Sequence, residues 1–226
     1  MSKAIVTAGQ ARSLIASFAI DTPWDGIIAD IQTFIELKPS QRGQFFADFV
    51  RNGCRLVIGE IKSIPTKPFN LAEFLGEGWT VWKGPVDGDG LSGEEDIDFR
   101  SLAVTQIEIN KFLFETCLRD DERSITGEEK LRRLKENPNF IRFGGNVFLG
   151  LWGDYQANKE NSALEWFYRE RKITYLDFPG LVLRNPHGNR RVLYLSWLDD
   201  GEWYWDCHWL DGSCFADGFS AGCASQ

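Results

Sequence analysis

Hydrophobic residues in the first fifty positions follow the spacing of helices that bury one face. Segments 14–18 and 27–35 place apolar side chains at intervals of three and four residues. Asp21, Thr22 and Pro23 precede the second segment and suit a helix cap and first turn. A third helix is expected over 41–52, with Gly53 after its last turn. Residues 1–70 are therefore predicted to form a region of short helices.

The pattern changes after Gly53. A strand-like run over 54–58 leads to Pro65 and Pro68, which interrupt a β-ladder. A turn-rich acidic segment follows at 84–96. We expect a domain boundary within 70–100, with residues 71–226 forming the second domain.

Helical and strand-like patterns alternate in this second domain. Apolar alternation from Leu102 to Phe114 predicts strands. Helices are expected over 126–135, 146–155 and 162–171, the first with acids in its first turn and bases in its last. A hairpin is expected around the turn at 184–190, and a further strand after the loop at 199–201. The predicted class is α+β: short N-terminal helices, then an α+β domain with a C-terminal antiparallel sheet.

Charge narrows the class of partner. The 226 residues carry 33 acidic and 25 basic side chains, a formal net charge of −8. This balance argues against nucleic acid or an anionic membrane as the main partner. No run of apolar residues is long enough to span a bilayer, and Gln10, Arg12 and Ser13 interrupt any signal peptide. The default expectation is a cytoplasmic protein without a cofactor, with display at a cell surface left open.

The five cysteines follow no metal-site or disulfide pattern. Cys54, Cys117, Cys207, Cys214 and Cys223 include no pair at the usual zinc-ligand spacing. Their odd number argues against a disulfide framework. We expect five free thiols and no bound metal.

Catalytic residues are few. His187 lies in a predicted turn, and His208 follows Cys207 directly. Neighbouring residues on a strand point to opposite faces, which disfavours a Cys–His catalytic pair. Hence the chain is not expected to be an enzyme.

The acidic loop supports an alternative function. Asp87, Asp89 and Glu94 suggest a calcium loop, but Leu91 and Ser92 stand where an oxygen ligand and glycine are needed. An irregular calcium site at 87–98 stays open. The alternative is a small hydrolase or a calcium-dependent carbohydrate-binding protein that uses this loop.

The most informative stretch is the aromatic and acidic C-terminal segment. Trp197, Trp203, Trp205 and Trp209 are expected to form a fixed scaffold, because residues two apart on a strand share a face. The positions between them mix acids, thiols, an imidazole and aromatics, a composition typical of adaptable binding surfaces. The predicted ligand-binding positions are Tyr204, Asp206, Cys207, His208, Asp211, Ser213, Cys214, Phe215, Ala216, Asp217 and Phe219.

This arrangement resembles the variable proteins of diversity-generating retroelements. In that family, a C-type-lectin-like domain ends in a segment diversified by mutation of adenines. Such mutation of AAC or AAT codons yields a mixture like this one but never Trp, so the resemblance implies template-fixed tryptophans. It also implies a variable segment at about 203–220.

The stretch 100–225 is also similar to uncharacterised proteins of candidate-phylum bacteria. The similarity rests on RSLA at 100–103, GEEKL at 127–131, and VLR and GNR around the turn at 182–190. Together, these resemblances imply a non-enzymatic protein that displays a diversified surface to an unknown protein or small-molecule ligand.

Overall fold

The computed structural model describes residues 63–225, which belong to one of two compact units of the chain. The units divide between Gly59 and Glu60, before the expected 70–100 interval. The helices expected in the first fifty residues and the strand expected over 54–58 lie outside the described residues. The described region is mixed α and β, with mostly antiparallel sheets.

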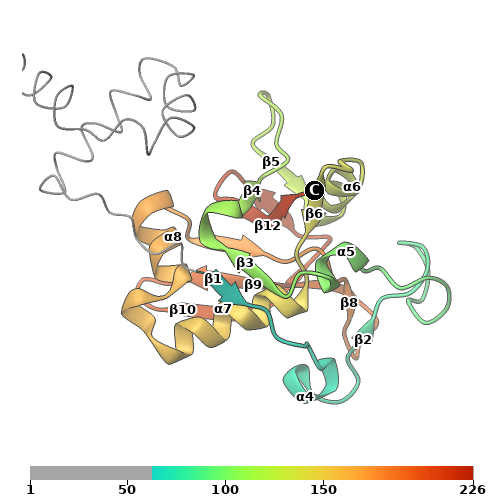
Figure 1. The fold of residues 1–226 in the computed structure, drawn as a ribbon. Coiled ribbons are helices and arrows are strands. Elements are labelled where there is room, and N and C mark those ends of the chain that lie inside the picture. The colour runs from blue at the N-terminus through green and yellow to red at the C-terminus, as the bar shows by residue number, and fades with distance from the viewer. Residues whose placement is uncertain (1–62, 226) are drawn as a thin grey trace, which may run out of the picture. The chain divides into compact units, whose positions relative to one another are not determined.

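Short helices and strands alternate along this region (Figure 1). The helices are α4 (Leu71–Leu75), α5 (Phe99–Leu102), α6 (Gly127–Lys135), α7 (Gly145–Ala157) and α8 (Ala163–Arg171), with 3₁₀ turns at Ile109–Lys111 and Lys159–Asn161. The strands are β1 (Ser63–Pro65), β2 (Thr80–Val81), β3 (Gln106–Glu108), β4 (Leu113–Glu115), β5 (Ser124–Thr126), β6 (Phe140–Arg142), β7 (Tyr175–Asp177), β8 (Leu183–Arg184), β9 (Arg190–Trp197), β10 (Trp203–Trp209), β11 (Ser213–Phe215) and β12 (Gly218–Ala224).

The main sheet of the described region has eight strands. Its order is β2-β8-β9-β7-β12-β4, with β10 on β9 and β6 on β12. Strands β7 and β12 run parallel, and the other pairs in this sheet are antiparallel. Two smaller sheets pair β1 with β3 and β11 with β5.

One face of the main sheet packs against the larger hydrophobic core. The side chains of this inner face include Leu176, Leu195 and Trp203, which share a hydrophobic core with Phe148 of α7 and Phe167 of α8. Helix α6 lies over part of the opposite, outer face, where a second cluster joins Leu131 to Val192 and Leu210. The two-residue period of each strand therefore decides which side chains reach the inner core and which reach the outer face.

The three longest helices of the described region confirm the sequence prediction. Thr126 caps α6 by accepting a hydrogen bond from the Glu129 N–H at 3.2 Å, and Ser162 caps α8 through the Glu165 N–H at 3.1 Å. Helix α7 covers the expected 146–155 segment. The hairpin of β8 and β9 and the strand β10 also form where expected.

The strands expected from Leu102 to Phe114 are partly wrong. The segment contains only the short β3 and β4, separated by a 3₁₀ turn, and Leu102 ends the helix α5. Asp98 starts this helix by accepting hydrogen bonds from the Arg100 N–H and guanidinium, and it also accepts one from the Arg142 N–H. Burial alone raises the pKa of Asp98, but these bonds to Arg100 and Arg142 outweigh it and lower the pKa. A local cap therefore overrides the alternating pattern.

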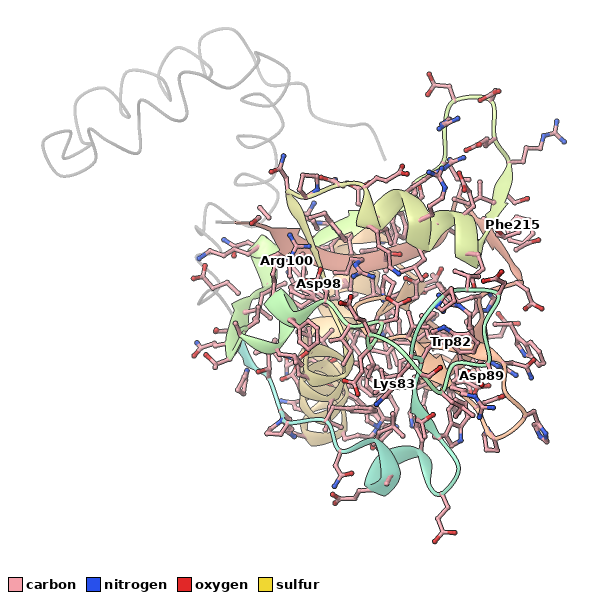
Figure 2. The ribbon with its side chains drawn as sticks, turned by 90° about the vertical axis from the view of Figure 1, so that its right-hand side faces the viewer. Trp82, Lys83, Asp89, Asp98, Arg100 and Phe215 are labelled. Carbon is pink, nitrogen blue, oxygen red and sulfur yellow. The ribbon has the colours of Figure 1, made fainter. Side chains whose placement is uncertain are left out.

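The acidic loop at 84–96 is part of this unit rather than a linker. The Lys83 N–H donates to the Gly90 carbonyl at 3.1 Å, and the Asp96 N–H donates to the Trp82 carbonyl at 2.9 Å. Figure 2 shows Lys83 and Asp89 on this loop beside Trp82. Gly90 has φ +73°, and a Cβ there would lie 2.5 Å from the Trp82 ring, so only glycine fits. These contacts hold the loop against the buried Trp82 side chain.

Candidate functional site

Strand β10 separates buried from exposed side chains at alternate positions. Trp203 is 1% exposed and Cys207 6%, and both belong to the inner core. Tyr204 and Asp206 are exposed on the outer face, and His208 is half-buried there. Cys207 and His208 thus lie on opposite faces, as the sequence predicted.

A surface pocket lies next to the outer-face end of β10. Its volume is about 190 Å³. Phe215, on its rim, is 57% exposed and lies at the edge of the folded region in Figure 2. The lining residues come from β7, β10, β11, the turn before β12 and the first residue of β12: Tyr175, His208, Ser213, Cys214, Phe215, Asp217 and Gly218.

Two of the lining residues, Tyr175 and His208, belong to a group of packed rings that also includes Tyr194. The Tyr175 and Tyr194 rings stack with centroids 4.9 Å apart, and the His208 ring lies edge-on to each at 6.2 Å. Two polar atoms of this group, Tyr175 Oη and His208 Nε2, are buried and have no hydrogen-bond partner among residues 63–225. Burial lowers the pKa of His208, so its imidazole is neutral at pH 7. Buried polar atoms normally have partners, so these two are exceptions among the atoms of the pocket-lining residues, and neither atom is itself exposed to the pocket.

A buried ion pair is hydrogen-bonded to the pocket-lining residue Gly218. Lys130 Nζ lies 2.7 Å from Asp177 Oδ2 and donates to the Gly218 carbonyl at 2.9 Å. Ser220 Oγ donates to Asp177 Oδ1 at 2.5 Å. A void of about 10 Å³ is lined by Lys130, Asp177 and His208 among others. These bonds join α6, β7 and β12. They hold the start of β12, which follows the turn that carries Asp217.

The four scaffold tryptophans differ in burial. Trp203 is buried, Trp197 stacks on Tyr168 at 4.0 Å, and the half-buried Trp205 ring lies 4.5 Å from Phe74. Trp209 is 44% exposed. One face of the Trp209 ring is covered by the Arg191 guanidinium, 3.5 Å from the ring centroid, so Trp209 differs from the other three in exposure, and its scaffold role stays a prediction.

The predicted ligand-binding positions divide into two groups. Cys207 and Cys214 are buried, with Cys214 also lining the pocket, and Phe219 is half-buried against Phe114 at a centroid distance of 6.3 Å. A ligand-binding role for these three positions stays a prediction, and their burial separates them from the remaining positions. The exposed or half-buried positions, which we call the display set, are Tyr204, Asp206, His208, Asp211, Ser213, Phe215, Ala216 and Asp217.

Comparisons with protein-family models, curated proteins and solved structures were then made. No match was found in any of the three. The assignment of a function to this chain therefore rests on the site itself.

The acidic loop does not assemble a metal site. Within residues 63–225, no group of three or more His, Cys, Asp or Glu side chains is placed to hold a metal ion. Asp96 pairs with Lys135 and Arg190, and Asp98 with Arg100. Arginine and lysine side chains therefore already neutralise the Asp96 and Asp98 carboxylates.

Two further features of the described region concern its thiols and its helices. Cys117, Cys207, Cys214 and Cys223 are free, while Cys54 lies outside the described residues. Between residues 63 and 225, no helix is long and apolar enough to cross a membrane.

Sequence reasoning missed the part of the site that lies outside the C-terminal segment. Tyr175, Tyr194, Lys130 and Asp177 were not singled out. Tyr175 and Asp177 share the outer face of β7, and only the parallel pairing of β7 with β12 brings them to the 213–218 turn. Since that pairing joins segments more than forty residues apart, no local pattern could have revealed it.

Proposed function

We propose that this protein is a non-enzymatic ligand-binding protein whose C-terminal part is a C-type-lectin-like scaffold for a variable surface. The observation that carries the proposal is the alternation on β10. Trp203 and Cys207 are inward, whereas Tyr204, Asp206 and His208 reach the outer face beside a pocket. Substitutions at the outward positions leave the core contacts in place, so this surface can change while the fold is kept.

The surroundings of the segment also support this role. Strand β10 pairs with β9 over seven residues, from Trp203 opposite Trp197 to Trp209 opposite Arg191. The 210–218 segment is held in place by the pairing of β11 with β5 and by the hydrogen bond that Lys130 donates to the Gly218 carbonyl. Binding positions carried by such rigid elements are held in place before a ligand arrives, which lowers the entropy cost of binding.

The proposal makes no use of the acidic loop. Asp96 and Asp98 are paired with basic side chains, and Ser220, which bonds to Asp177, is fully buried. The Asp96 and Asp98 carboxylates are therefore not free to act as cation ligands, and the Ser220 hydroxyl is not accessible as a nucleophile. No observation in the described region favours the calcium-dependent or hydrolytic alternative over the display of a binding surface.

Two matched libraries test the proposal. One randomises six members of the display set, Tyr204, Asp206, His208, Ser213, Phe215 and Asp217; the other randomises six inner-face positions, Leu176, Leu193, Leu195, Trp203, Cys207 and Ala221. We expect most members of the first library and few of the second to remain soluble and to melt cooperatively, because surface changes usually alter stability by less than about 0.5 kcal/mol. Selection from the first library should then yield binders to purified test proteins. Equal loss of folding in both libraries would overturn the proposal.

The resemblance adds an observation on the gene. The proposal expects a reverse-transcriptase gene and a near-copy of the last coding segment beside this gene. It also expects related sequences that differ mainly within 204–219. Related sequences that vary equally across Trp203, Trp205 and Cys207 would argue against a diversified surface.

A further inference from the structure

The pocket beside β10 carries an unusual combination of groups. Tyr175 and Phe215 offer aromatic rings, Asp217 offers a carboxylate, and Tyr175 Oη and His208 Nε2 are buried without partners among the described residues. The lining includes no ammonium or guanidinium group. We propose that this pocket binds a small organic ammonium ion, a protonated primary amine that carries an apolar group. This inference rests on the proposed binding role of the outer face and names its ligand class.

Charge favours a cation in this position. Asp206 lies two residues before His208 on the same face, and Asp211 and Asp217 are exposed on the adjoining turn. The chain has no Lys or Arg after Arg191. Lys130 is buried and already paired with Asp177, and the Arg191 guanidinium lies over Trp209. Asp217 is therefore the only charged side chain among the residues that line the pocket.

Hydrogen-bonding capacity points to the same ligand. An ammonium group has three N–H donors and no acceptor. The exposed Asp217 carboxylate can accept these donors directly, whereas Tyr175 Oη and His208 Nε2 are enclosed and would accept a donor only after their side chains rotate toward the pocket. Burial lowers the pKa of His208, so the ring is neutral at pH 7 and leaves one nitrogen as an acceptor. A neutral imidazole also adds no charge that repels a cation.

Size and shape fit an amine with a ring-sized body. The pocket volume of about 190 Å³ exceeds the roughly 150 Å³ of a cavity that admits benzene. The faces of tyrosine and phenylalanine rings attract cations through their quadrupoles. Phe215, on the rim, can cover the apolar part of the ligand while the ammonium group reaches the polar atoms.

Arg123 is the residue on which a competing anion site would depend. It is exposed and precedes Ser124, which pairs with Phe215 in the β5–β11 register. If the pocket took carboxylates, Arg123 would supply the positive charge. An ammonium site and an anion site therefore predict opposite preferences for the charge of the ligand. The first depends on Asp217 and the second on Arg123.

The test uses the full-length protein and three probes that share one ring. Benzylammonium, benzyl alcohol and benzoate differ in head-group charge and are titrated at neutral pH, with amide NMR shifts as the readout. We expect benzylammonium to bind most tightly and to shift the amides of Tyr175, His208 and Asp217. Nα-acetyl-lysine methylamide, titrated in parallel, distinguishes a lysine side chain of a protein from a free amine as the source of the ammonium group.

Variants locate the interaction. Asp217→Asn removes the charge and keeps the shape, and we expect it to weaken benzylammonium binding about threefold while leaving benzyl alcohol unchanged. Tyr175→Phe should weaken benzylammonium binding as well. Asp199→Asn, in the turn at the other end of β10, is the matched control and should change neither affinity.

The failing outcomes are distinct. Preference for benzoate with loss in Arg123→Gln, equal binding of the three probes, or no shift at the pocket with millimolar benzylammonium would each overturn the ammonium proposal. The proposed function would survive these results if the display-set library still folds. Conversely, loss of folding in that library would overturn the proposed function whatever the probes show.

Discussion

Trp203 and Trp209 lie on the same strand and the same face of it, yet their surroundings differ. Trp203 is fully buried and packs edge-on to Trp197, with ring centroids 5.9 Å apart. Trp209 is 44% exposed and contacts the Arg191 guanidinium. We expect Trp203→Ala to lower the free energy of unfolding by about 3–5 kcal/mol and Trp209→Ala by less than about 1.5 kcal/mol. Denaturant titration of the two variants measures both, and equal losses would contradict the assignment.

The thiols give a second prediction at the scale of single residues. Burial raises the pKa of Cys207 to about 12 and that of Cys117 to about 11. The nucleophilic thiolate is therefore scarce in the folded protein. We expect a thiol reagent to titrate five groups after denaturation without reductant, but to react only slowly with Cys207 and Cys214 in the native state. Fewer than five groups in the denatured chain would reveal a disulfide.

The sequence allowed part of this residue-scale picture to be predicted. Alternation placed Tyr204, Asp206 and His208 on one face, and the structure agrees. The same alternation would have put Cys207 inward with Trp203, but its place among mixed residue types suggested a surface position. The exposure of Trp209 depends on where the core ends along β10, which a strand pattern does not encode.

Among the secondary-structure elements, α6 is tied to the main sheet by one buried ion pair. Lys130 and Asp177 are almost completely buried, and their partners Gly218 and Ser220 lie on β12. We expect Lys130→Met to cost about 3–5 kcal/mol, because it leaves the Asp177 carboxylate buried without its cation. Lys130→Met combined with Asp177→Leu should recover much of this loss. A double-mutant cycle measured by denaturant unfolding checks the coupling, and additive losses would contradict it.

Local signals explain which elements could be predicted. Thr126 and Ser162 mark the starts of α6 and α8 in the sequence, and the 184–190 turn marks the β8–β9 hairpin. Strand β7 is only three residues long and pairs in parallel with β12, far along the chain. Such pairing is determined by tertiary packing, so the Tyr175 side of the pocket was not predictable.

At the scale of the whole molecule, the boundary between the two compact units, between Gly59 and Glu60, defines a fragment that can be tested. Ile64 of β1 is 1% exposed and belongs to the inner core. We expect residues 60–226 to melt cooperatively by calorimetry. A fragment that starts at residue 70 should be less stable by at least about 2 kcal/mol, because it loses the buried Ile64 side chain. Absence of a cooperative transition in the longer fragment would show that the C-terminal unit needs the first 59 residues to fold.

The central claim is that the outer face of β10 and the adjoining turn form a changeable surface on a fixed core. Its most direct test is the melting temperature of one variant in which Tyr204, Asp206, His208, Ser213, Phe215 and Asp217 are all replaced by Ser or Ala, compared with Trp203→Ala. We expect the sixfold variant to melt within about 5 °C of the unchanged protein, and Trp203→Ala to melt more than about 10 °C lower. A sixfold variant that unfolds, or that loses as much as Trp203→Ala, would show that these positions belong to the core and would contradict the claim.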